Sequence, residues 1–72
     1  MEGYGELANA IIIHAAKDYR SALRRLRKLR DNREALRAAR ALERFFRSGW
    51  YRRLTELDGN VLINRLREET AK

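Results

Sequence analysis

The chain has 72 residues, neither cysteine nor proline, and a formal net charge of +7. This length allows one small domain with a thin core, so association with further copies or with a partner is expected. The absence of cysteine excludes a disulfide framework and a thiolate metal site. Because Ala, Leu, Arg and Glu dominate, the composition predicts an all-α fold.

The positive charge is concentrated in the middle of the chain. Residues 17–53 carry 14 Lys and Arg side chains against four acidic ones, a net charge of +10, whereas the two flanks together are net −3. A field concentrated in this way attracts polyanions, namely nucleic acid, phosphorylated ligands, an acidic protein face or an anionic membrane.

The N-terminal region does not resemble a secretion signal. Glu2 and Glu6 stand where a leader would carry cations, and the apolar run around Ile11 is short and interrupted by Asn9 and His14. No stretch approaches the roughly 20 apolar residues of a membrane span. We therefore expect a soluble protein of the cytoplasm that does not act at a membrane.

Residues 6–30 are expected to form a long first helix after a flexible lead-in at residues 1–5, where two glycines occur without a capping pattern. Apolar side chains recur on one arc of this helix, and basic side chains occupy the opposite arc. The apolar positions are Ala8, Ile11, Ile12, Ala15, Ala16, Tyr19, Ala22, Leu23, Leu26 and Leu29, and the basic ones are Lys17, Arg20, Arg24 and Arg27. Ile13 projects from the basic side, either as a singly exposed apolar residue or as a contact with a second copy of the chain.

Asp31-Asn32 marks the break before a second helix, because either side chain can cap it and Glu34 suits its first turn. So short a connection makes the two helices antiparallel neighbours with their apolar seams facing each other. The second seam consists of Ala35, Ala38, Ala39, Ala41, Leu42, Phe45 and Phe46. At about 100° per residue, five arginines form one strip roughly 21 Å long on the other side of this helix. This arginine strip comprises Arg33, Arg37, Arg40, Arg44 and Arg47.

The remaining residues predict two shorter helices that close the hairpin. Ser48-Gly49 interrupts the second helix, and a third helix over residues 50–57 would place Trp50, Leu54 and Leu57 over the end of the hairpin. Asp58-Gly59-Asn60 is a turn and N-cap signal before a C-terminal helix. The predicted fold is therefore a single all-α domain at residues 6–70. It is an antiparallel helical hairpin with a short third helix and a C-terminal helix, a small bundle that we expect to be oligomeric.

No combination of residues indicates catalysis. The chain has one histidine, no cysteine, and no Ser or Thr placed beside a base and its orienting acid. His14 and Asp18 lie four residues apart, but two ligands do not make a metal site, and a histidine at the edge of the core explains His14 equally well. The four glycines are scattered, so no phosphate-binding loop is present. We expect a protein that is not an enzyme and carries no metal or cofactor.

The arginine strip is the most specific feature of the sequence, because a guanidinium donates to phosphate in a planar fork. The candidate ligand-binding residues are Lys17, Arg20, Arg24, Arg33, Arg37, Arg40, Arg44 and Arg47, with Trp50 or Tyr51 as a stacking surface for a base. A structural alternative is a solvated strip with salt bridges to Glu34, Glu43 and the acids of the last helix. In the same way, Phe45, Phe46 and Trp50 suit a core. An ion pair between Asp18 and Arg47 across the hairpin would explain both of those residues without a ligand.

Several segments of the chain resemble a known group of proteins. They are Ala16-Lys17-Asp18-Tyr19-Arg20, then Glu43-Arg44-Phe45-Phe46-Arg47-Ser48-Gly49-Trp50-Tyr51, then Leu54-Thr55, Asp58-Gly59 and Leu62-Ile63. Over residues 10–68 the chain resembles small helical proteins encoded in phages and prophages of Gram-positive bacteria, chiefly through its KDYR and FFRS-x-W patterns. The resemblance implies an accessory protein in the host cytoplasm that acts by binding, for example by blocking a host defence protein or sequestering a nucleotide signal. The middle of this chain is richer in arginine than is typical of the group.

The sequence thus predicts non-catalytic binding of a phosphate-bearing partner, either nucleic acid or a nucleotide, through arginine-rich helix faces. The alternative is a protein-interaction module that inhibits or adapts a host defence protein or a phage protein through its helical surface.

Overall fold

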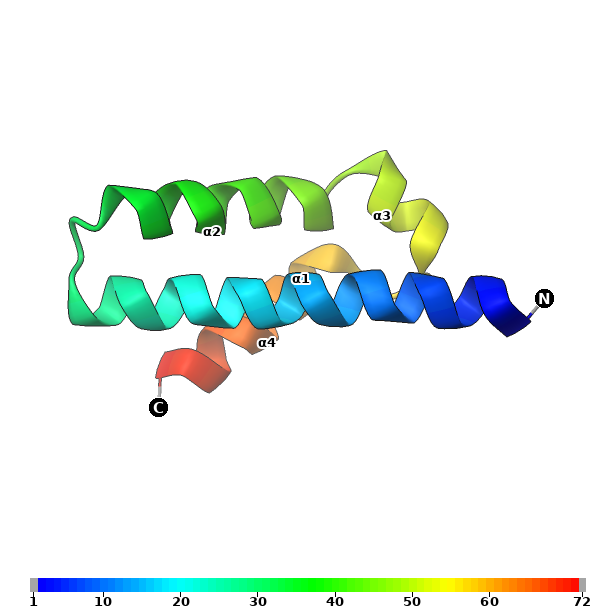
Figure 1. Cartoon of the computed structure of the whole chain (residues 1–72), viewed down its shortest axis with the longest axis horizontal. Helices are drawn as coiled ribbons and strands as arrows, with labels where there is room; N and C mark the ends of the chain where they lie inside the picture. The colour runs from blue at the N-terminus through cyan, green and yellow to red at the C-terminus, as the bar shows by residue number, and fades with distance from the viewer. Residues whose placement is uncertain (1, 72) are drawn as a thin grey trace.

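A computed structural model describes residues 2–71, with side chains described for residues 6–71. This part of the chain forms four helices and no strand: α1 (Glu2–Lys28), α2 (Arg33–Phe46), α3 (Gly49–Leu54) and α4 (Gly59–Ala71). Figure 1 shows α1 and α2 as an antiparallel hairpin, with α3 at the end of α2 and α4 crossing behind α1. The predicted all-α class and the order of the elements are confirmed.

The first helix is longer at its start than the sequence predicted and ends two residues earlier. Residues 2–5, which were expected to be a lead-in, already belong to α1, and Met1 lies outside the described residues. At the other end, the Asn32 amide donates to the carbonyl of Leu29 at 3.1 Å, which closes a tight turn. The Asn32 side chain then caps α2 by accepting from the Ala35 amide at 3.0 Å, one of the two predicted caps.

The core lies where α1, α2 and α4 meet, and α3 closes one end of it. The largest fully buried side chains come from all four helices: Tyr19, Phe46, Tyr51, Ile63 and Leu66. The three aromatic rings among them pack edge to face, with 5.8 Å between the centroids of Tyr19 and Phe46 and 5.7 Å between those of Phe46 and Tyr51. Each such pair stabilises the fold by about 0.5–1.5 kcal/mol beyond the area it buries. Fully buried Ala35 and nearly buried Ala22 and Ala39 let the two hairpin helices approach closely.

The third helix turns a different aromatic inward from the one predicted. The Ser48 hydroxyl caps α3 by accepting from the Tyr51 amide at 3.2 Å, so the helix begins at Gly49 and ends at Leu54. Tyr51 is therefore buried at 1% exposure, whereas Trp50 is 58% exposed and does not cover the hairpin. Leu57, expected on the same helix, lies in the loop after it and is half exposed.

The start of α4 packs directly against the end of α2. A Cβ atom added at Gly59 would lie 1.8 Å from the carbonyl oxygen of Phe46, so only glycine fits this contact. Gly59 thereby sets how closely α4 approaches the hairpin.

Among the helices of residues 2–71, none is long and apolar enough to cross a membrane.

Candidate ligand-binding face

Four members of the arginine strip line the outer side of α2. Arg33, Arg37, Arg40 and Arg44 are exposed, while the buried residues of this helix, Ala35, Ala39 and Phe46, face the core. We call these four the arginine face. They extend over about 16 Å of helix. Within residues 6–71 none of the four forms a salt bridge or a side-chain hydrogen bond. Salt bridging by the neighbouring acids therefore does not account for these four side chains in the described part of the chain.

Arg47, the fifth member of the strip, is engaged within the protein. Its Nε donates to Asn60 Oδ1 at 2.9 Å, and its Nη1 lies 3.9 Å from Glu43 Oε1. The ion pair with Asp18, considered as a structural alternative, does not form among the described residues. Asp18 lies on the far side of the hairpin in a groove with Ala38, whereas Arg47 reaches toward α4.

The basic side chains of α1 are partly covered by α4. Arg20 Nε lies 2.8 Å from Glu69 Oε2, and an Nη1 group of Arg27 donates to the backbone oxygen of Thr70. Lys17 and Arg24 remain exposed and form no salt bridge with other described residues. Of the predicted α1 ligand residues, Arg20 is thus held by an acid of the last helix and two remain open to solvent.

The two basic strips do not form one site. Because the apolar seams of α1 and α2 face each other, the strips that back them point away from the hairpin in different directions. Lys17 and Arg24 therefore belong to one surface, and the arginine face belongs to another. A short ligand that lies along α2 contacts only the second.

The two predicted stacking residues lie in different environments. Trp50 is exposed and available to a planar ligand, but Tyr51 is not, because its ring lies in the core against Phe45 and Phe46. Burial and the charge of Asp58 raise the pKa of Tyr51. Its hydroxyl is buried and has no hydrogen-bond partner among the described residues.

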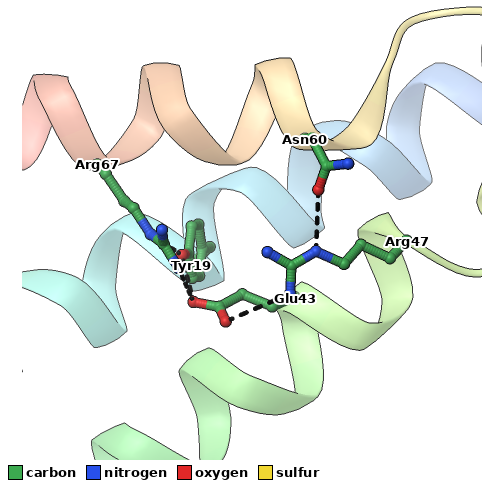
Figure 2. Close-up of polar contacts among 5 residues, drawn as sticks. All are labelled: Tyr19, Glu43, Arg47, Asn60 and Arg67. Atoms are coloured by element: carbon green, nitrogen blue, oxygen red, sulfur yellow. Dashed lines mark hydrogen bonds and ion pairs between the residues drawn. The ribbon is translucent and has the colours of Figure 1, made fainter.

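A polar cluster that the sequence did not predict joins α1, α2 and α4 (Figure 2). The Tyr19 hydroxyl donates to Glu43 Oε2 at 2.6 Å, and Arg67 donates to the same oxygen through Nη2 at 2.9 Å. Arg67 Nε also donates to the Tyr19 hydroxyl at 3.1 Å. Glu43 is thus used to hold three helices together rather than to neutralise the arginine face. In the sequence, the sign of this structural role is that Glu43 is an acidic residue within a run of arginine and apolar residues.

Each pKa shift in the cluster favours the protonation state that the hydrogen bonds require. Burial alone would raise the pKa of Glu43, but the hydrogen bonds from Tyr19 and Arg67 outweigh it and lower the pKa below its ordinary value. Burial and the bond to Glu43 raise the pKa of Tyr19. The bond to Glu43, together with Tyr19, raises the pKa of Arg67. At neutral pH Glu43 is ionised and Tyr19 is neutral, which are the forms that this arrangement needs.

A groove of about 500 Å³ between α1 and α4 is also lined by arginine. Leu23 and Leu26 form part of its wall, with Arg27, Arg30 and Arg67 around them. Two of these guanidiniums are already bonded, to Thr70 and to Glu43. The C-terminal ends of α1 and α4, which carry partial negative charge, border the same groove. It is therefore less suited to phosphate than the arginine face is.

Residues 6–71 contain no group of three or more His, Cys, Asp or Glu side chains that could hold a metal ion.

In comparisons with known proteins, no family model, no curated protein and no solved structure matches the chain. The resemblance to phage-encoded proteins consequently stays a prediction.

Proposed function

We propose that this protein is a non-catalytic binding protein whose arginine face contacts the phosphates of a nucleic acid. The observation that carries the proposal is that four exposed guanidiniums share one side of α2 without a salt bridge to any described residue. Arginine is suited to this role because its planar fork donates two hydrogen bonds to one phosphate.

The spacing favours a polymer over a single nucleotide. The arginine face is spread along about 16 Å of a convex helix instead of converging on one point. A duplex carries one charge per about 1.7 Å of its axis, so it presents several phosphates over this length. A mononucleotide meets only one or two of the four side chains. Trp50, exposed in the helix that follows α2, offers a stacking surface for a base.

The phage context and the cytoplasmic location enter this proposal through the KDYR and FFRS-x-W resemblance. In that setting the protein acts as an accessory factor that occupies nucleic acid in an infected bacterium. We also propose that it works as a homo-oligomer, because two copies double the number of phosphate contacts without any new site.

The experiment is fluorescence anisotropy with labelled single-stranded DNA, duplex DNA and RNA over a range of salt concentrations. The test variant is R37Q/R40Q/R44Q, and the matched control is R52Q/R53Q/R65Q, which removes the same charge from exposed arginines elsewhere. Each lost phosphate contact lowers the salt slope on duplex DNA by about 0.9, so the test variant should lose about two to three units of slope. The control should lose much less.

Two results would overturn the proposal. Equal losses in the two triple variants would show that net charge alone attracts the nucleic acid and that α2 has no special role. Weak binding by the wild type that does not respond to salt would exclude phosphate recognition altogether.

A second candidate function is favoured by Trp50. A tryptophan that is 58% exposed is unusual, and tryptophan is enriched among the residues that dominate protein–protein binding energy. In this case the protein blocks or adapts a host or phage protein through α3. A pull-down from host lysate with and without nuclease separates the two functions. A partner that survives nuclease and is lost with W50A supports the second, and a partner lost with nuclease supports the first.

A further inference from the structure

The face of the hairpin that α4 leaves uncovered carries a shallow groove. Arg20 contacts α4 through Glu69, and at about 100° per residue Asp18 lies roughly 160° around α1 from Arg20. In Figure 1, α4 lies behind the hairpin, so this face is the open one. The groove has a volume of about 360 Å³ and is lined by Asp18, Ser21, Ala22, Arg25, Ala38, Ala41 and Leu42.

The charges on this groove are complementary to themselves. Asp18 and Arg25 are seven residues apart, so they lie within about 20° of each other on α1 and about 10 Å apart along its axis. Both are exposed, and neither forms a salt bridge with another described residue. Ser21 and Ala22, which are small, lie midway between them. One acid and one base placed symmetrically about small residues make this surface self-complementary, as a two-fold contact between identical helices requires.

We propose that this groove is the contact surface between two copies of the chain. A two-fold axis that passes between Ser21 and Ala22 sets the two α1 helices antiparallel. Asp18 of each copy then lies opposite Arg25 of the other copy, so two ion pairs form. Ala38 and Ala41 of α2 are small enough to let the second α1 approach the groove closely.

The same axis places Leu29 beside the turn that contains Ile11 and His14 of the second copy. Leu29 is 57% exposed in the single chain, and Ile11 is only partly buried. The contact therefore covers apolar surface that the single chain leaves in water, which favours association. A second copy fits this groove better than a polyanion does, because the groove carries both signs of charge whereas the arginine face carries only one.

This inference names the contact surface of the homo-oligomer proposed above. It is independent of the proposed phosphate contacts, because it concerns other residues and its test contains no nucleic acid. None of the four residues of the arginine face lines the groove. Failure of dimerisation therefore leaves the phosphate contacts untested, and failure of nucleic-acid binding leaves the dimer standing.

The test is sedimentation velocity and native mass spectrometry of the wild type, D18R, R25D and an equimolar mixture of the two variants. We expect a wild-type dimer, and we expect each single variant to raise the dimer dissociation constant at least about tenfold, because like charges then face each other twice. The mixture should recover a heterodimer, since Arg at position 18 then faces Asp at position 25 of the other chain, and the original pair also forms. Native masses identify that heterodimer directly.

The matched controls are R65D and E68R, which make the same charge changes on the exposed side of α4 and should leave the dimer unchanged. Circular dichroism establishes that all variants keep their helical content. A wild type that is monomeric throughout the measured range would overturn the proposal. So would a mixture of D18R and R25D that dissociates as readily as each variant alone.

Discussion

Replacing Glu43 with glutamine removes the charge at the centre of the polar cluster and keeps the shape of the side chain. Glu43 receives one hydrogen bond from Tyr19 and one from Arg67, and its side chain is 18% exposed. Hydrogen bonds to charged groups contribute about 1.5–3 kcal/mol each when shielded from water. Arg67 is about half exposed, so its contribution is reduced by solvent. We therefore expect E43Q to lower the free energy of unfolding by about 2 kcal/mol.

In a chain of this size, that loss corresponds to a fall in melting temperature of about 8–16 °C. The assay is guanidinium unfolding at neutral pH followed by far-UV circular dichroism, with E34Q as the matched control. Glu34 is exposed in the first turn of α2 and forms no salt bridge with other described residues. Loss of its interaction with the helix dipole should cost only about 0.3–1 kcal/mol. Equal destabilisation by E43Q and E34Q would refute a structural role for the cluster.

The pH dependence of the difference in stability between wild type and E43Q follows from the direction in which the pKa of Glu43 is shifted. The pKa of Glu43 is lower in the folded chain than its ordinary value of 4.5, so the folded state binds this proton less readily than the unfolded state does. The stability that Glu43 contributes is thus fully present above pH 4.5 and is lost as the pH falls through the folded-state pKa. The difference in unfolding free energy between wild type and E43Q should shrink over that interval. A difference that stays constant to lower pH would contradict the assigned shift.

Three substitutions test the packing around α3 and α4. G59A should destabilise the fold by at least about 1–3 kcal/mol, because its Cβ would overlap the Phe46 carbonyl. G49A should instead stabilise it by about 0.4–1 kcal/mol. Apart from its chain neighbours and the backbone of its own helix, no atom lies within 4 Å of the new Cβ, and α3 needs no positive φ there. Y51F should leave the free energy of unfolding unchanged or raise it, because the removed hydroxyl is buried without a partner among the described residues. Chemical unfolding measures the free energy of unfolding of all three variants. A G59A variant as stable as G49A would count against the packing described, and so would a Y51F variant clearly less stable than wild type.

Local patterns in the sequence were sufficient to predict the hairpin. The three- and four-residue spacing of apolar side chains marks both long helices, and Asn32 is a cap that can be identified from its own neighbours. The start of α1 was missed because no capping residue marks it and two glycines suggested a loop. Trp50 was expected over the end of the hairpin, but Tyr51 is the buried residue, because a shift of one residue in a short helix turns a side chain by about 100°.

The polar contacts could not be predicted because they depend on where α4 lies. A pair of Arg47 with Asp18 across the hairpin was one alternative, but α4 brings Asn60 within 2.9 Å of Arg47 and Arg67 within 2.9 Å of Glu43. The periodicity of the last helix gives its apolar side and not its direction across the other two helices. For the same reason, the partial cover of Arg20 by Glu69 became visible only in the folded chain.

The most direct measurement is the salt dependence of binding to one labelled DNA duplex by the wild type and by R37Q/R40Q/R44Q. If the guanidiniums on the outer side of α2 hold phosphates, the wild type binds more weakly as salt rises, and the variant has a slope shallower by about two to three. Identical slopes for the two proteins would show that α2 does not contact the duplex.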